Sequence, residues 1–247
     1  MPGSTVDITT PDGVANAYLT RPDDEPRPGV LYMMDAFGLR PVIEEMADRI
    51  AADGYVVLAP NVFYRAGRSP VPPMPDMSDP AQRQSFFESL APLREPLSPE
   101  AVASDGGAYL DYLAQVAGPG PVAITGYCMG VRLGWQIAAA HPGRVAALAG
   151  FHAGGLVTDA PESPHRGAAK LDSELYFGFA DNDPSMSADQ IATLGQTLDE
   201  AGARYRSEVY EGAAHGYTMA DTPAFNEDAR ERHFRELGAL LERTLSG

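Results

Sequence analysis

Two hydrophobic patterns alternate along the chain. One consists of short, nearly continuous apolar runs, which are typical of strands buried on both faces. These runs occupy residues 28–36, 55–63, 121–128, 145–152 and 174–181. In the other pattern apolar residues recur at helical spacing, over 40–54, 98–117, 129–143, 187–202 and 222–245. Strands that alternate with helices in this way predict a mostly parallel sheet with helices on both faces.

Three further segments complete this pattern, at the N-terminus, near the C-terminus and in the middle of the chain. VDITT and VANAYLT, separated by PDG, predict an N-terminal hairpin. Residues 204–215 predict the last strand and the loop after it. Residues 69–97 begin with a segment rich in Pro and Met, which predicts a surface excursion with a short helix at 82–90. Because no repeat, low-complexity tract or linker is visible, we expect one domain over residues 1–247.

The amino-acid composition disfavours some classes of function. The chain has 247 residues with 34 acidic and 18 basic side chains, for a formal charge of −16. This surface disfavours binding to nucleic acid or anionic lipid. We find neither a signal peptide pattern nor an apolar run of about 20 residues, so we expect no membrane segment. A lone cysteine allows no disulfide within the chain and fits a cytoplasmic protein. We expect no metal or cofactor, a small-molecule substrate, and a monomer or small homo-oligomer.

The lone cysteine, Cys128, lies in GYCMG between a predicted strand and a predicted helix. This is the G-x-nucleophile-x-G pattern, with Cys where Ser is usual. A sharp turn there would lift the thiol above the sheet, and the helix N-terminus would favour a thiolate. A buried core cysteine is the plainer alternative, and the turn alone leaves the two interpretations balanced.

A thiol nucleophile needs a base, and His215 is the best candidate among the five histidines. It lies in a glycine-flanked loop after the last strand, from which an imidazole can reach the strand ends. We interpret His141 as a helix-end residue, His165 and His233 as surface residues, and His152 as a packing or cleft residue.

The base in turn needs a carboxylate to orient it. FGFADND places Asp181 at the end of a strand and Asp183 two residues later, next to a proline. We choose Asp181, because it is closer to the strand end, and interpret Asp183 as a turn residue. The order Cys128, Asp181, His215 is the chain order of nucleophile, acid and histidine in α/β-hydrolases.

With these residues the chain resembles the dienelactone hydrolase family, the cysteine-dependent branch of the α/β-hydrolase fold. GYCMG, FADND, EGAAHGY, MMDAFGL and APNVFYR carry the resemblance, which extends from about residue 5 to residue 243. It implies a Cys128–His215–Asp181 triad. It also implies an oxyanion hole made by the backbone N–H groups of Ala36 and Met129.

The resemblance also implies a residue that controls the thiol and a set that contacts substrate. Asp35 stands where the family has a glutamate that keeps the resting thiol neutral, one methylene shorter here. Arg83 corresponds to one of two family arginines that hold a substrate carboxylate, whereas Met219 replaces the other. We therefore expect a more apolar cleft near Phe37, Tyr127, Tyr217 and Met219.

Three functions follow as hypotheses. The first is hydrolysis of small lactones or esters through an acyl-thioester on Cys128. The second is a carboxylesterase for uncharged esters, favoured by the missing second arginine. The third is a non-catalytic or redox-responsive protein, which the absence of a second, resolving cysteine disfavours.

Overall fold

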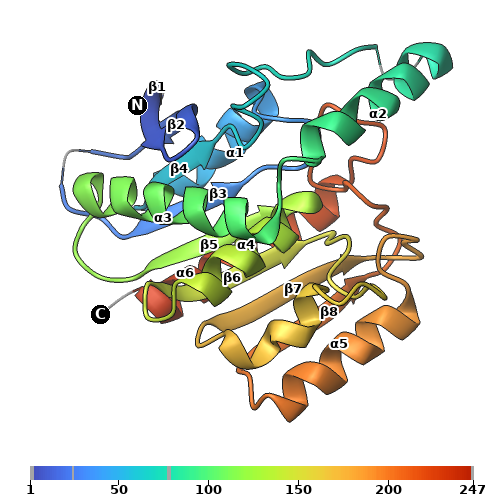
Figure 1. Ribbon diagram of the computed structural model, residues 1–247. Helices are drawn as coiled ribbons and strands as arrows, with labels where there is room; N and C mark the ends of the chain where they lie inside the picture. The colour runs from blue at the N-terminus through green and yellow to red at the C-terminus, as the bar shows by residue number, and fades with distance from the viewer. Residues whose placement is uncertain (1–2, 24, 77–78, 246–247) are drawn as a thin grey trace.

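The centre of the molecule is an eight-stranded sheet with the strand order β1-β2-β4-β3-β5-β6-β7-β8 (Figure 1). The structure is a computed structural model that describes residues 3–23, 25–76 and 79–245. Strands β3 to β8 are parallel, whereas β1 and β2 form the predicted antiparallel hairpin. The strands are β1 (Ser4–Thr10), β2 (Gly13–Thr20), β3 (Gly29–Met33), β4 (Val56–Pro60), β5 (Val122–Tyr127), β6 (Val145–Phe151), β7 (Glu174–Ala180) and β8 (Tyr205–Tyr210).

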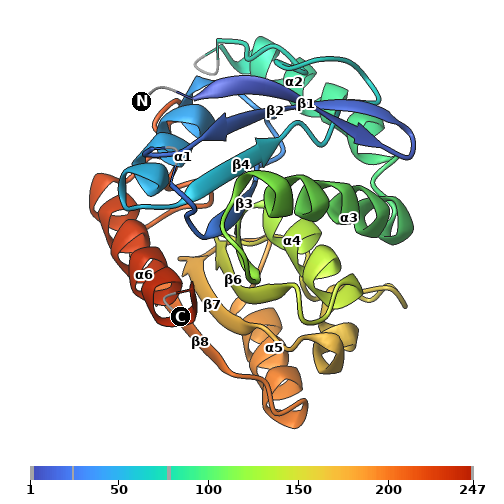
Figure 2. The same cartoon turned by 90° about the vertical axis from the view of Figure 1, so that its left-hand side faces the viewer.

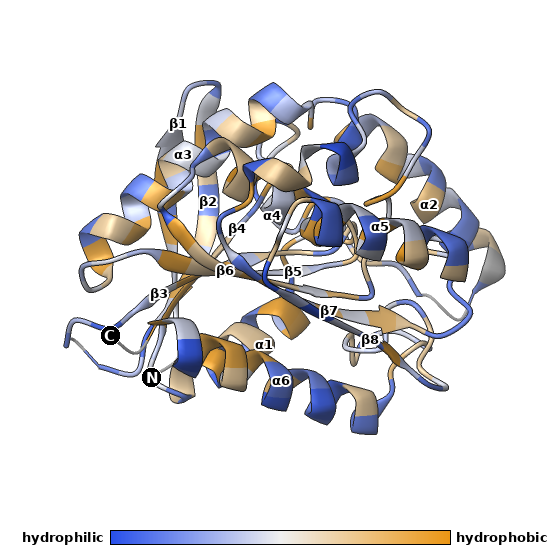
Figure 3. Ribbon diagram, turned by 90° about the horizontal axis from the view of Figure 1, so that it is seen from below, coloured by the Kyte–Doolittle hydropathy of each residue, from blue (hydrophilic) through white to orange (hydrophobic). Residues whose placement is uncertain are grey.

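Helices cover both faces of this sheet, as the sequence pattern predicts. Helices α1 and α6 pack on one face, and α3, α4 and α5 pack on the other (Figures 2 and 3). Their orange sides face the sheet and their blue sides face outward in Figure 3, as expected for amphipathic helices. The helices are α1 (Pro41–Ala52), α2 (Pro80–Arg94), α3 (Pro99–Val116), α4 (Met129–Ala140), α5 (Ala188–Glu200), α6 (Glu227–Leu245) and the 3₁₀ helix η1 (Pro164–Lys170). The architecture is that of the α/β-hydrolase fold.

Two helix boundaries differ from the sequence prediction. Helix α6 begins at Glu227 rather than near residue 222, and the Asn226 side chain accepts the N–H of Ala229. The freed residues 216–226 form a loop instead. Helix α2 is longer than predicted, because the side chain of Asp79 accepts the N–H groups of Ala81 and Gln82 and starts the helix early. Both changes affect segments above the carboxyl ends of the parallel strands.

Helix α4 lies against β3 at an unusually close approach through Gly130. A Cβ atom on Gly130 would lie 2.2 Å from the carbonyl oxygen of Met33 and 2.6 Å from that of Met34. Both contacts are with backbone, so a side chain here cannot be accommodated by rotating a neighbour. Gly130 therefore fixes how closely the turn at Cys128 sits to the segment that follows β3.

We predict that Gly130→Ala lowers the free energy of unfolding by about 3 kcal/mol, because the helix must move off the sheet. Gly238→Ala in α6 is the matched control, since nothing lies within 4 Å of its Cβ position. That control should be neutral or stabilising by up to about 1 kcal/mol. Urea unfolding of both variants measures the difference, and equal stabilities would contradict the close approach.

Among the described residues, no helix is long and apolar enough to cross a membrane.

Candidate active site

Cys128 occupies the sharp turn between β5 and α4 that the sequence pattern predicts. Its backbone has φ 53° and ψ −116°, a left-handed conformation that residues with a Cβ rarely adopt. The N–H of Cys128 donates to the carbonyl of Phe151 on the neighbouring strand at 3.1 Å, which holds the turn. The side chain is half-buried and lines a cavity. The thiol is therefore presented to the cavity from the sheet edge.

Backbone strain is concentrated at this edge. Positive φ at non-glycine residues occurs, within the described ranges, at Cys128, His152 and Asn182. These residues lie just past the ends of β5, β6 and β7, which are neighbours in the sheet. Strained non-glycine backbone often clusters at functional sites. This observation makes the carboxyl edge of these strands the candidate site.

His215 and Asp183 meet above this edge. Nδ1 of His215 lies 2.5 Å from Oδ2 of Asp183, whose side chain is only 1% exposed. The other oxygen of Asp183 accepts the N–H of Ser185 at 2.8 Å. The carboxylate is thus fixed on one side by backbone and faces the imidazole on the other. On its other side His215 interacts with Cys128 in the same cavity, which raises the pKa of the imidazole and gives the order thiol, imidazole, carboxylate.

Our choice of Asp181 as the partner of His215 was wrong in this structure. One oxygen of Asp181 accepts the N–H of Gly212 at 3.0 Å, and the other accepts the side-chain amide of Asn182 at 3.0 Å. Asp181 therefore anchors the start of the loop that carries His215. Asn182, with φ 51°, bends the chain so that Asp183 reaches the imidazole.

The charges around His215 change its protonation. Burial alone would lower its pKa, but the hydrogen bonds to Asp183 and Cys128, together with their charges, raise that pKa from 6.5 to about 10. Burial would raise the pKa of Asp183, yet its bonds to His215 and Ser185 lower it. The geometry therefore favours a protonated His215 imidazole beside the Asp183 carboxylate at neutral pH.

The cavity above Cys128 has a volume of about 470 Å³ and is lined largely by apolar side chains. Its floor holds Cys128, His152 and His215, and one wall is made by Asp35, Ala36 and Phe37. Arg83, Phe87, Leu90 and Arg94 form the wall from α2, and Ser185, Gly216, Met219, Thr222, Pro223 and Ala224 complete the lining. Of the substrate residues expected from sequence, Phe37, Arg83 and Met219 lie here.

Comparison with known proteins identifies the family. The model of the dienelactone hydrolase family matches residues 15–245 of the chain. The chain belongs to the dienelactone hydrolase family. A Mus musculus protein named carboxymethylenebutenolidase homolog is 29% identical over 224 residues, which cover 87% of this chain and 83% of that protein. The family resemblance seen in the sequence is therefore confirmed, and the chain is a hydrolase that acts on carboxylic ester bonds.

Solved structures agree on the fold. A Klebsiella pneumoniae protein solved under the dienelactone hydrolase name superposes with a TM-score of 0.82 at 22% identity, over 96% of this chain and 97% of that one. A dienelactone hydrolase-like promiscuous phosphotriesterase from metagenomic libraries gives a TM-score of 0.75 at 19% identity, over 99% of both chains. At these identities the likeness shows the fold alone.

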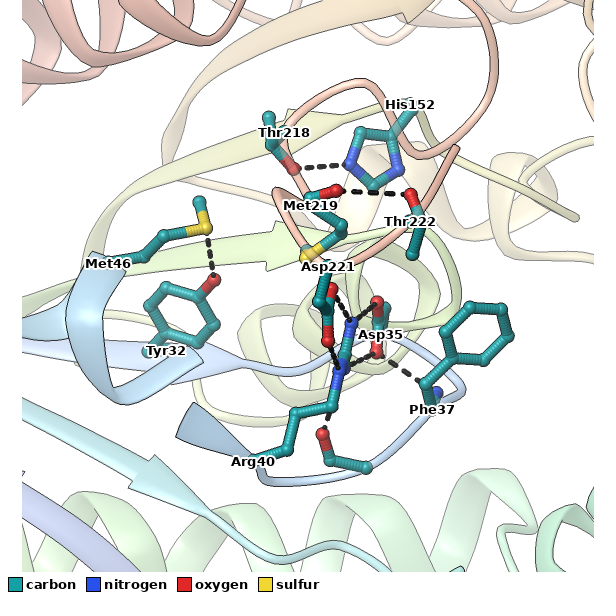
Figure 4. A network of polar contacts seen from close by, with 11 residues as sticks. Tyr32, Asp35, Phe37, Arg40, Met46, His152, Thr218, Met219, Asp221 and Thr222 are labelled. Atoms are coloured by element: carbon teal, nitrogen blue, oxygen red, sulfur yellow. Dashed lines mark hydrogen bonds and ion pairs between the residues drawn. The ribbon is translucent and has the colours of Figure 1, made fainter. Parts of the chain in front are cut away.

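Asp35, to which the family resemblance gives a role in controlling the thiol, forms a buried ion pair. Figure 4 shows the Arg40 guanidinium between the carboxylates of Asp35 and Asp221. Arg40 donates to both oxygens of Asp35, at 2.7 and 3.0 Å. One of these oxygens also accepts the N–H of Phe37 at 2.9 Å. Arg40 was not predicted from the sequence as a site residue. It lies five residues after Asp35, so its side chain can reach back across the loop that joins them.

Tyr127 and Tyr217 do not line the cavity, contrary to our expectation. Both are fully buried. The hydroxyl of Tyr127 lies 2.8 Å from Nε2 of His233, and that of Tyr217 donates to the carbonyl of Gly178 at 3.1 Å. Tyr127 is the last residue of β5, and its hydroxyl contacts His233 of α6 rather than the cavity. Both tyrosines therefore pack in the core rather than in the cavity.

Two histidines that we placed at the surface are buried. His233 is 0% exposed on α6, and burial lowers its pKa to about 3. His165 is 9% exposed and its Nδ1 lies 2.8 Å from the hydroxyl of Ser163. The charged residues beside His233 in sequence are less buried than His233 itself. The sequence around His233 could therefore not show that this histidine faces Tyr127.

His152 is a cavity residue that remains neutral. It is 0% exposed, and its Nε2 lies 2.7 Å from the hydroxyl of Thr218 (Figure 4). Burial and the nearby His215 hold the pKa of His152 well below its usual value. Its ring centroid lies 5.3 Å from that of His215. This neutral ring packs against His215 without adding a second positive charge.

A second arginine of the cavity was not recognised from the sequence. Arg94 lines it together with Leu90, Phe87 and Arg83, at intervals of four, three and four residues along α2. This spacing places the four side chains on one stripe of the helix. Arg132 is nearby on α4, where burial and then the charge of Arg94 lower its pKa. The helical spacing from Arg83 to Arg94 is the signal that could have found this residue.

Two backbone N–H groups are candidates for an oxyanion hole. Met129 is the first residue of α4, so its N–H has no acceptor within the helix. Ala36 follows Asp35 in the cavity wall. The described residues contain no group of three or more His, Cys, Asp or Glu side chains arranged to hold a metal ion.

Proposed function

We propose that the chain hydrolyses small esters or lactones through Cys128 as nucleophile, His215 as general base and acid, and Asp183 as the carboxylate that orients His215. The observation that carries this proposal is the placement of His215 between Asp183 and Cys128 on the floor of the cavity. Family membership supports the same reaction class.

In the first half of the proposed reaction, the Cys128 thiolate attacks the carbonyl carbon of the substrate. The negative charge that develops on the carbonyl oxygen would be held by the N–H groups of Met129 and Ala36. Collapse of this intermediate breaks the bond to the alkoxide, which takes a proton from the His215 imidazolium. The product is an acyl-thioester on Cys128.

In the second half, water attacks the thioester carbonyl while His215 accepts one of its protons. The carbon–sulfur bond then breaks, which releases the acid and restores the thiolate–imidazolium pair. Asp183 keeps Nδ1 of His215 bonded throughout, so that Nε2 faces the reacting atoms. A redox role is less well supported, because the chain has no second cysteine to form a disulfide with Cys128.

The cavity walls suggest two substrate types. Phe87, Leu90 and Met219 offer an apolar surface, which suits an uncharged ester. Arg83 and Arg94 offer two cations in the same wall, which suits a substrate carboxylate. Arg94 therefore supplies a second arginine from α2, where the sequence has Met219 at the family position. We favour a small ester or lactone that carries a carboxylate, with the uncharged ester as the alternative.

A pair of aryl esters tests both points, one with a terminal carboxylate in the acyl chain and one with a methyl group there. We expect turnover of both, and Arg94→Met should raise KM about tenfold for the carboxylated ester only, because a charge-assisted hydrogen bond is lost. Arg68→Met is the control, since Arg68 is exposed and paired with Asp7 far from the cavity.

Failure to hydrolyse either ester would contradict the proposed function. An equal loss on both esters in Arg94→Met would instead contradict a role for Arg94 in recognising the carboxylate, and would favour the uncharged substrate.

A further inference from the structure

Asp35 and Arg40 form a buried pair at the wall of the cavity that holds Cys128. Each is 4% exposed, and Asp35 lines the cavity together with Cys128. The guanidinium of Arg40 forms a bidentate pair with Asp35, and Nη1 also donates to the carbonyl of Gly38 at 3.1 Å. Because an arginine stays protonated at all ordinary pH values, the guanidinium keeps its positive charge beside Asp35.

The opposite edge of the same guanidinium contacts the histidine loop. Nε of Arg40 donates to one oxygen of Asp221 at 2.7 Å, and Nη2 donates to the other at 3.2 Å. Asp221 lies in the loop 216–226, six residues after His215 in sequence. Arg40 therefore joins the loop that carries Ala36 to the loop that follows His215 (Figure 4).

This arrangement restrains the Asp35 carboxylate. Both of its oxygens bond Arg40, and one also accepts the N–H of Phe37. A free carboxylate in the cavity would disfavour a second anion on the Cys128 sulfur. A paired carboxylate that cannot rotate has a much weaker effect, because the guanidinium compensates its charge at close range.

Other charges face the thiol from several elements. They are His215 after β8, Asp183 after β7, the neutral His152 after β6, and Arg83 and Arg94 on α2. Of these only Asp183 is an anion, and it is already bonded to His215. Asp35 is therefore the carboxylate of the cavity wall whose effect on the thiol depends on Arg40.

We propose that Arg40 is a positioning residue that holds Asp35 away from Cys128, keeps the thiol available as a thiolate without substrate, and fixes the Ala36 segment against the histidine loop. This inference rests on the proposed function only in taking Cys128 as the nucleophile. It differs from the sequence expectation for Asp35, in which the carboxylate keeps the resting thiol neutral.

The test is the pH dependence of Cys128 alkylation by iodoacetamide, which reports the thiolate directly because the chain has one cysteine. Arg40→Met should move the midpoint of the rate profile upward by about one pH unit or more, since Asp35 is then an unpaired anion. Adding Asp35→Asn to Arg40→Met should return the midpoint to the wild-type value. Asp35→Asn alone should leave it at or below that value.

Thermal unfolding of each variant checks that the protein is folded. If Arg40→Met does not fold, Arg40→Lys serves instead, because a lysine cannot make the bidentate pair. Its midpoint should also move upward, by a smaller amount, and Asp35→Asn should reverse the shift. An unchanged midpoint in a folded Arg40 variant would overturn the proposal. So would a shift that persists in the double variant, because that shift would come from distortion or from the unpaired Asp221 rather than from the Asp35 charge.

The alkylation profile does not require an ester substrate. If the proposed function failed, the wild-type protein would turn over no ester while the alkylation midpoints still reported on Arg40. The two failures are therefore distinguishable.

Discussion

Replacement of Cys128 by Ala should reduce ester hydrolysis at least about 10³-fold, because the acyl-thioester cannot form. The cavity, the oxyanion donors and His215 remain, so weak substrate binding should persist. Steady-state kinetics with an activated aryl ester measures the loss. Mass spectrometry of the wild-type protein during turnover should show one acyl group on Cys128, and the variant should show none.

The matched control is Cys128→Ser, which keeps a nucleophile of similar shape. A serine hydroxyl ionises far less readily than a thiol, so this variant should also lose most of its activity, although less than Cys128→Ala. A Cys128→Ala protein with full activity would show that the thiol is a structural feature of the turn. In that case the strained backbone at residue 128 would need another explanation.

The arrangement of strands could be predicted from the sequence because each strand is a separate apolar run. Parallel strands that are buried on both faces need apolar residues at nearly every position. They can therefore be recognised without knowing how the helices pack on them. The loops above the sheet have no such pattern. The start of α6 depends on the side chain of Asn226, and residues 216–226 take their shape from contacts such as Asp221 with Arg40. Such contacts join residues far apart in sequence and leave no local signal.

The same distinction separates the turn at Cys128 from the residues around it. The turn could be predicted because it needs glycines at fixed local positions. Tyr127 could not be placed, since its environment depends on His233 from α6, more than a hundred positions away in the chain. The choice between Asp181 and Asp183 depended on one backbone angle, the positive φ of Asn182, which sequence order does not reveal.

If Asp183 is the carboxylate that orients His215, Asp183→Asn should lower kcat/KM by about 10²- to 10⁴-fold. An amide in place of the carboxylate removes the charge that holds the pKa of His215 near 10, so this pKa should fall. A raised pKa keeps His215 protonated at neutral pH. When that pKa falls, His215 becomes neutral, and the thiolate of Cys128 loses the positive charge that stabilises it. The alkylation rate of Cys128 near pH 7 should fall as well.

Asp181→Asn is the control for this prediction, because Asp181 bonds the loop backbone at Gly212 rather than the imidazole. It should lower activity only a few-fold and should leave the pH profile of alkylation unchanged. If Asp181→Asn were instead the damaging change, the histidine loop would have to adopt another position in the working enzyme. The pair of variants therefore decides between the two carboxylates by a difference in pH profile, which a general loss of stability would not produce.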